Sequence, residues 1–157
     1  MSRLASRLNY SVIGYDINRF SLFVASVLSL GFKNMSYKKE DFMSLQQQFD
    51  VVSATSLLSV VDEKECALKK LITLLKDSDA TLIIIEPTEK MCKEHVRELM
   101  VDLRTSWYYK GLLLWASARE GKAISSSLFN VLEDVEVSHR YFLHEMVRVT
   151  YIKKCHG

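Results

Sequence analysis

The feature that most constrains the fold is a short, unbroken run of apolar residues, TLIIIEP, at residues 81–87. Apolar residues without alternation are typical of a strand that is covered on both faces, as in a parallel sheet. Shorter apolar runs occur at Tyr10 to Tyr15 and at Phe49 to Ser53. We therefore expect these three segments to form strands of a largely parallel sheet.

Helical patterns separate these runs. Apolar residues three and four positions apart predict helices over residues 20–28, 68–75 and 92–103. Asp62 and Glu65 have the spacing of a capping box, which predicts that the second helix begins near them. The alternation of strands and helices predicts an α/β layer fold.

The last third of the chain has a different pattern. VEVSHRYF at residues 135–142 and VRVTYIKK at residues 147–154 favour strands, and only LHEM lies between them. Such a short connection predicts an antiparallel hairpin. Residues 107–132 are expected to be mostly helical, either extending the preceding helix or forming a separate helix broken near Gly111. No repeat or linker divides the chain, so we expect a single domain over residues 1–157.

Composition narrows the class of protein. Among 157 residues, 21 basic and 19 acidic side chains give a net charge of +2, which does not indicate binding of nucleic acid. No apolar run approaches the roughly 18 residues that span a bilayer, so no membrane association is expected. The three cysteines lie far apart, without a CxxC pair, which suits a reducing compartment. We expect an intracellular, cytoplasmic protein.

Two groups of side chains could be considered as metal ligands. Cys92 and His95 have ligand spacing, and His139, His144 and Glu145 cluster in the predicted hairpin. No second Cys/His pair completes a zinc-finger pattern. Neither a G-x-S-x-G nucleophile elbow nor a Walker glycine–lysine loop is present. We therefore expect no metal site, and the catalytic residues stay unknown at this point.

Residues 49–87 resemble the class I S-adenosylmethionine-dependent methyltransferases. A strand led by Asp50 is followed by a helix ending in LLK at residues 74–76, the turn DSDA and the strand LIIIEP. DSDA stands where the family more often has Pro-Gly-Gly. The predicted C-terminal hairpin is also typical of the family. The resemblance implies an α/β, Rossmann-like methyltransferase sheet that is mostly parallel and has an antiparallel hairpin at its C-terminal end.

The resemblance implies S-adenosylmethionine as the cofactor and assigns residues to it. Asp16 would accept hydrogen bonds from the two ribose hydroxyls, with Ile17 beside it, because a carboxylate offers two acceptor oxygens. Asp41 would receive the adenine amino group, with Phe42 near the ring. Two alternatives stay open: Asp16 could instead cap the following helix, and Asp41, next to Glu40, could simply face solvent.

The reacting end of the cofactor is expected after the second apolar run. The resemblance places the methyl group and the substrate at a loop formed by Ser53, Ala54 and Thr55, with Glu86 nearby. The aromatic run WYY at residues 107–109 and Trp115 could line a substrate pocket, although an aromatic cluster on a helix more often packs in a core or an interface.

One part of the family pattern is absent. No glycine precedes Gly14, and residues 2–9, SRLASRLN, look like the end of a helix. The family's first strand and its glycine-rich loop, whose backbone approaches the methionine part of the cofactor, are therefore not found. We expect an N-terminally truncated fold whose cofactor binding is impaired.

The absent strand lies centrally in the family, between the strands expected at residues 10–15 and 49–53. Buried unpaired amides cost about 1–3 kcal/mol each. We therefore expect a homodimer or a partner chain that supplies the strand, direct pairing of the two neighbouring strands, or a fragment of a longer enzyme. Two functions stay open: a methyltransferase-like domain, as a fragment or a degenerate form, and a non-catalytic interaction module within a larger assembly.

Overall fold

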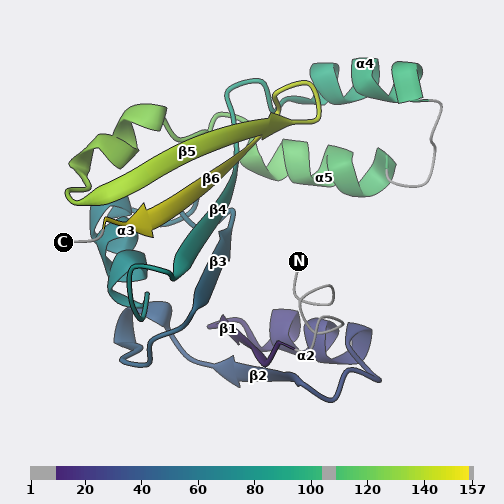
Figure 1. The fold of residues 1–157 in the computed structure, drawn as a ribbon. Helices are drawn as coiled ribbons and strands as arrows, with labels where there is room; N and C mark the ends of the chain where they lie inside the picture. Colours follow the sequence, from purple (N-terminus) through teal and green to yellow (C-terminus); the bar gives the residue numbers. More distant parts are fainter. Residues whose placement is uncertain (1–9, 104–108, 156–157) are drawn as a thin grey trace. The chain divides into compact units, whose positions relative to one another are not determined.

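The computed structural model describes residues 10–103 and 109–155 (Figure 1). The chain divides into two compact units, Met1–Gln46 and Gln47–Gly157. The single domain expected over residues 1–157 stays a prediction. No helix within the described residues is long and apolar enough to cross a bilayer.

The first unit is a β–α–β arrangement. Strand β1 (Val12–Asp16) runs parallel to strand β2 (Met35–Lys39), and helix α2 (Arg19–Leu28) connects them. A short 3-10 turn, η1 (Phe42–Ser44), follows β2. The first strand and the first helix expected from the sequence are therefore confirmed, with small shifts at their ends.

Gly14 allows β1 and β2 to pack closely. It lies opposite Tyr37 in the parallel register, and a Cβ added at Gly14 would be 2.7 Å from Cδ1 of Tyr37. Atoms this close would have to move apart, so the glycine leaves room for the tyrosine ring against the backbone of β1.

The second unit contains a four-stranded sheet with the order β3-β4-β6-β5. Its strands are β3 (Val51–Thr55), β4 (Thr81–Pro87), β5 (Val135–Phe142) and β6 (Val147–Lys154). β3 is parallel to β4, whereas β6 is antiparallel to both β4 and β5. The predicted hairpin is confirmed with its predicted bounds, and so is the mixed α/β fold with parallel strands and an antiparallel hairpin.

Three helices and a 3-10 turn accompany this sheet. They are α3 (Lys64–Thr73), α4 (Lys93–Leu103), α5 (Tyr109–Arg119) and η2 (Ser126–Val131). Helices α4 and α5 pack side by side (Figure 1). Gly111 lies inside α5 and does not break it. The region expected to be mostly helical, residues 107–132, thus contains a separate helix, α5, and the turn η2. Residues 107 and 108 lie outside the described residues.

Helix α3 begins differently from the prediction. Its N-cap is Glu63, whose side chain makes no capping hydrogen bond, so the predicted capping box of Asp62 and Glu65 is wrong. The backbone N–H of Lys64 donates to the carbonyl of Asp62 at 3.1 Å, which places Asp62 in a turn before the helix. The predicted N-cap, Asp62, therefore lies one residue before the observed N-cap, Glu63.

The core of the second unit is apolar. Leu82 and Ile84 of β4 and Leu68 of α3 are fully buried. A second cluster joins α4 and α5 to the start of β6, and it comprises Met91, Val96, Leu99, Ala116, Met146 and Val147. Each large side chain buried in this way contributes about 1.5–3 kcal/mol to folding. The two helices are thereby fixed near the carboxyl ends of β3 and β4.

Candidate functional site

The first group of predicted site residues lies where β1 and β2 end. Asp16 is the last residue of β1 and is in register with Lys39, the last residue of β2. Asp41 follows two residues later. Because the strands are parallel, their carboxyl ends share one edge of the two-stranded sheet. The structure therefore brings Asp16 and Asp41 to the same edge, here called the β1–β2 edge.

Asp16 is not the cap of the helix that follows it. The N-cap of α2 is Asn18, whose side chain accepts hydrogen bonds from the N–H groups of Phe20 at 2.9 Å and Ser21 at 3.3 Å. Asp16 is half-buried, and its Oδ1 accepts the N–H of Asn18 at 2.8 Å. It therefore orients the residue that caps the helix, and one hydrogen bond leaves its carboxylate with further acceptor positions.

The other members of this edge are more exposed. Ile17 is 68 % exposed, Phe42 is half-buried, and Asp41 is exposed. The Oδ1 atom of Asp41 accepts the N–H of Met43 at 3.0 Å and so caps the turn η1. Asp41 therefore has a local structural role, and its predicted contact with adenine stays a prediction, as do the cofactor contacts of Asp16, Ile17 and Phe42.

Ser53 and Ala54 lie inside β3 and not in the loop expected after it. Pairing with β4 continues to Thr55, which is opposite Ile85, so the loop begins at Ser56. Ser53 is exposed and Ala54 is buried, since successive side chains of a strand point to opposite faces. The structure corrects their placement, while their role as cofactor ligands stays a prediction.

The carboxyl ends of β3 and β4 bring together a set of buried and half-buried polar side chains. We call this set the β3–β4 cluster; it consists of Ser56, Ser59, Glu86, Trp115 and Arg119. Ser56 and Ser59 follow β3, Glu86 lies near the end of β4, and the other two come from α5. Polar groups that converge at the carboxyl ends of parallel strands are typical of ligand sites in α/β proteins.

Glu86 is the most buried member, with 1 % of its surface exposed. Its Oε1 accepts the backbone N–H of Leu58 at 2.8 Å and thereby holds the loop after β3 to the end of β4. Its Oε2 is buried and has no hydrogen-bond partner among the described residues. A buried polar atom without a partner is costly, so this oxygen is suited to accept or, when protonated, to donate one further hydrogen bond.

Burial raises the pKa of the Glu86 carboxyl above its ordinary value of 4.5. The N–H of Leu58, the nearby hydroxyl and N–H of Ser59, and the charge of Arg119 offset part of this increase. The groups of Ser59 lie close enough to lower the pKa, although neither has the geometry of a hydrogen bond to Oε2. The carboxyl therefore keeps its proton to a higher pH than an exposed glutamate does.

Ser56 forms the turn that closes this cluster. Its φ of 52° lies in the left-handed region, which is uncommon for a serine. Three hydrogen bonds hold it: its N–H donates to the carbonyl of Ile85 at 2.8 Å, Ser59 Oγ donates to its carbonyl at 3.0 Å, and Trp115 Nε1 donates to its Oγ at 3.0 Å. The surrounding contacts thus stabilise a backbone conformation that serine alone would rarely adopt.

Arg119 adds a positive charge one helical turn after Trp115. Its Nε is buried without a hydrogen-bond partner in the described part of the chain. In the sequence, Glu86 stands out because it is an acid within an apolar run. Nothing in the sequence around Ser56 or Arg119 indicated a site. Trp115 was identified only as an aromatic residue that could line a pocket.

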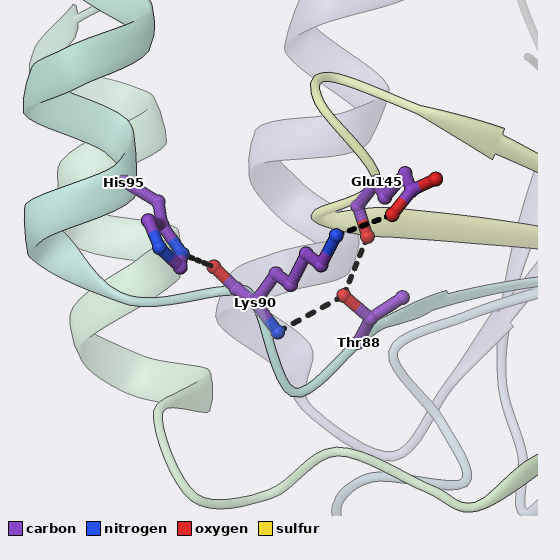
Figure 2. Close-up of polar contacts among 4 residues, drawn as sticks. All are labelled: Thr88, Lys90, His95 and Glu145. Carbon is purple, nitrogen blue, oxygen red and sulfur yellow. Dashed lines mark hydrogen bonds and ion pairs between the residues drawn. The ribbon is translucent and has the colours of Figure 1, made fainter.

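A second polar group ties the loop after β4 to the turn between β5 and β6 (Figure 2). Thr88 Oγ1 donates to the carbonyl of Glu145 at 2.6 Å and accepts the N–H of Lys90 at 3.2 Å. Lys90 Nζ also pairs with the carboxylate of Glu145. His95 Nδ1 is 2.8 Å from the carbonyl of Lys90 and is therefore occupied by the backbone. Within the described residues, no three His, Cys, Asp or Glu side chains are placed to hold a metal.

Comparisons with known proteins identify a family for this chain. Residues 1–129 match the family described as a methyltransferase domain. No protein of curated function matches the chain by sequence.

Solved structures resemble the chain in fold. The plantazolicin methyltransferase BpumL, in a complex with SAH, is 10% identical with a TM-score of 0.67, over 99% of this chain and 71% of that chain. The N-methyltransferase NodS from Bradyrhizobium japonicum WM9 is 12% identical with a TM-score of 0.56, over 92% of this chain and 73% of that chain. At such low identity the likeness shows the fold alone. The family match spans more than half of the chain, and the chain therefore belongs to the methyltransferase-domain family.

Proposed function

We propose that this chain is an S-adenosylmethionine-dependent methyltransferase domain whose own 157 residues bind the cofactor weakly. The observation that carries the proposal is the placement of Asp16 and Asp41 together at the β1–β2 edge. Family membership supports it, as do the complexes of BpumL and NodS with SAH, S-adenosylhomocysteine, which is the product that S-adenosylmethionine leaves after methyl transfer.

The β1–β2 edge fits the nucleoside part of the cofactor. The carboxylate of Asp16 has acceptor positions for a ribose diol beyond the one taken by Asn18, and Asp41 can accept an adenine amino group. When bound, S-adenosylmethionine supplies an already activated methyl group, so the protein mainly has to position the two reactants. Asp16 and Asp41 are therefore assigned to binding and not to bond making.

The methyl acceptor is proposed to lie against the β3–β4 cluster in the second unit. Glu86 is assigned there as a positioning residue, because it holds the loop after β3 through the N–H of Leu58. Its unpartnered Oε2 and the buried Nε of Arg119 are the groups with unused capacity for hydrogen bonds to a polar substrate.

Weak cofactor binding is proposed because no glycine-rich loop occurs in the sequence. The five glycines lie at positions 14, 31, 111, 121 and 157, with no Gly-x-Gly among them. Without two or three hydrogen bonds to the methionine end, at about 1.5–3 kcal/mol each for charged groups, a micromolar affinity would move toward the millimolar range.

A second candidate function is a non-catalytic interaction module. The observation that favours it is the exposure of apolar side chains on α2, where Phe20 is 73 % and Phe23 is 63 % exposed. A partner chain or a second copy that supplies a strand to β1 or β3 belongs to this candidate. A cytoplasmic location is part of both candidates, supported by the free thiols of Cys66, Cys92 and Cys155.

An NMR titration of the chain with S-adenosylhomocysteine tests the proposal. Asp16→Asn keeps an oxygen for the N–H of Asn18 but removes the charge, and we expect it to weaken binding about tenfold or more, since a hydrogen bond to a charged acceptor contributes about 1.5–3 kcal/mol. The matched control is Asp62→Asn, at an exposed residue before α3, which should bind like the natural chain.

Three outcomes contradict parts of the proposal. Tight micromolar binding to the natural chain would refute weak binding. Equal affinities of the two variants would show that Asp16 does not hold the ribose. Absence of any binding would leave the interaction module as the better account.

A further inference from the structure

Strand β5 is a long, regular strand at the end of the four-stranded sheet (Figure 1). It has eight residues, and all eight pair with β6 in one continuous register without a bulge. Its sequence, VEVSHRYF, contains neither lysine nor proline. Natural sheets usually protect such edges with lysine, proline, bulges or short strands. Apart from the charges of Glu136 and Arg140, β5 lacks these protections, which marks its outer edge as a site for adding another strand.

The register identifies the backbone groups that face the outer edge. The N–H of Cys155 donates to the carbonyl of Asp134 at 2.7 Å, and this pair continues the register in which Val135 lies opposite Lys154. Hydrogen-bonded pairs alternate along an antiparallel ladder. Even-numbered residues of β5 therefore bond to β6, and the odd-numbered residues 135–141 direct their N–H and C=O groups outward.

A second copy of β5 matches these outward groups. Two antiparallel β5 strands related by a two-fold axis at Ser138 place odd-numbered residues opposite odd-numbered residues, so their outward groups can bond. Glu136 then lies opposite Arg140 of the partner subunit, and the reverse pair forms on the other side of the axis. Glu136, Ser138 and Arg140 are all exposed in the single chain. The strand is thus complementary in charge to itself in this register.

Neighbouring registers fit less well. If the two-fold axis passes midway between two residues, each odd-numbered residue lies opposite an even-numbered residue of the other copy. The N–H and C=O groups of the even-numbered residues already bond to β6, so the two strands cannot pair. An axis at His139 places Glu136 opposite the apolar Phe142 and leaves Arg140 opposite Ser138. An axis at Val137 shortens the overlap of the two strands. Only the register centred on Ser138 combines backbone pairing over the strand with two opposite-charge pairs.

We propose that the chain forms a symmetric homodimer through antiparallel pairing of β5 with its own copy. The two four-stranded sheets would join into one continuous sheet through this contact. Tyr141 and Phe142, which are 49 % and 48 % exposed, would pack near Val135 and Asp134 of the partner subunit. The dimer does not depend on cofactor binding and is tested without a ligand.

Sedimentation equilibrium over a concentration series tests the charge pairs. Arg140→Glu places like charges opposite each other at two positions, and we expect the dimer dissociation constant to rise at least about tenfold. The double variant Glu136→Arg/Arg140→Glu restores both pairs and should restore the dimer. Because Glu136 also lies opposite Lys153 of its own chain, thermal melts of each variant show whether the hairpin is intact.

Disulfide trapping tests the register. In a chain with the exposed Cys66 and Cys155 changed to serine, Ser138→Cys places two thiols at the axis, where the Cα atoms of a non-hydrogen-bonded pair are about 4.5 Å apart. That distance allows a disulfide, so oxidation should give a covalent dimer. Glu136→Cys is the control, because its two copies would be about 13 Å apart along the strands.

The proposal is supported by a reversible dimer that is lost in Arg140→Glu, restored in the double variant and trapped by Ser138→Cys. A natural chain that stays monomeric at every concentration would overturn it. So would a dimer that Arg140→Glu leaves unchanged, or a Glu136→Cys control that cross-links as readily as Ser138→Cys.

Discussion

Replacing Glu86 with glutamine or with alanine separates the two properties of this buried carboxyl, namely its acceptor oxygen and its charge. Glutamine keeps an oxygen for the N–H of Leu58 and offers an amide group near the position of Oε2. Alanine removes both. Because Glu86 is 1 % exposed and Leu58 is fully buried, the N–H of Leu58 has no direct contact with bulk water.

The structure sets the expected magnitudes. In Glu86→Ala the N–H of Leu58 is left buried without an acceptor, which costs about 1–3 kcal/mol. The void left by the missing side chain adds to this, so we expect the free energy of unfolding to fall by about 2–4 kcal/mol. In Glu86→Gln the acceptor remains, and the change at acidic pH should be within about 1 kcal/mol.

The pH dependence has a definite sign. The folded-state pKa of Glu86 is raised above the ordinary value of 4.5, so below that pH both folded and unfolded chains hold the proton. As the pH rises above 4.5, the unfolded chain releases its proton first, and the free energy of unfolding falls until the folded-state pKa is passed. Glutamine has no such proton. The stability of Glu86→Gln relative to the natural chain should therefore increase with pH.

Other titrating groups do not disturb this comparison. The carboxyls of Glu94 and Glu145 have lowered pKa values, the first mainly through a hydrogen bond from its own backbone N–H and the second through Lys90. Their contributions have the opposite sign and are lost as the pH falls. Both groups are present in every variant, so they cancel in the difference between variants.

Chemical denaturation from about pH 4 to about pH 8 gives the difference curve. Hydrogen exchange at the amide of Leu58 gives the local readout, since this amide should exchange fastest in Glu86→Ala. The reasoning would be refuted if Glu86→Gln destabilised as much as Glu86→Ala, or if the difference between glutamine and the natural chain did not grow with pH.

Two further predictions concern stability and are checked by denaturation of purified variants. Gly14→Ala should lower the free energy of unfolding by about 1–3 kcal/mol, because the added Cβ would be 2.7 Å from the ring of its neighbour on β2. The matched Gly111→Ala, on α5 with nothing within 4 Å, should be neutral or raise it by up to about 1 kcal/mol. Burial, and secondarily the charge of Arg148, lowers the pKa of His139 below 6.5. The natural chain should therefore lose stability as the pH falls below 6.5, and His139→Asn should lose less; equal pH profiles would contradict this.

The hairpin and β4 could be predicted closely because their signals are local. The eight residues of β5 and of β6 favour strands, and a four-residue connection leaves an antiparallel hairpin as the simplest solution. The start of α3 could not be predicted as well. Asp62 and Glu63 are both acidic, and their spacing alone does not say which one precedes the first helical turn.

From the local sequence alone, the candidate site was predictable where an acid lies at or near the end of an apolar run. Asp16 and Glu86 have that signal, and the structure places both at the carboxyl ends of strands. Ser56 has no such signal in the local sequence. Its left-handed backbone depends on contacts with Ile85 and Trp115, which are distant in sequence. Arg119 reaches the cluster only because α5 packs where it does. Contacts that depend on tertiary packing leave no pattern in the local sequence.

The two edges of the four-stranded sheet allow the two partner hypotheses to be tested independently. The N–H of Ser56 bonds to β4, so the alternate residues Val51, Ser53 and Thr55 direct their amides away from β4. A strand supplied by a partner at β3 should slow the exchange of these three amides, whereas a dimer through β5 should leave them fast. Exchange measured on the natural chain and on Arg140→Glu separates the cases. Slow exchange in both would show that β3 is covered whether or not the β5 dimer forms, and fast exchange in both would contradict an added strand at β3.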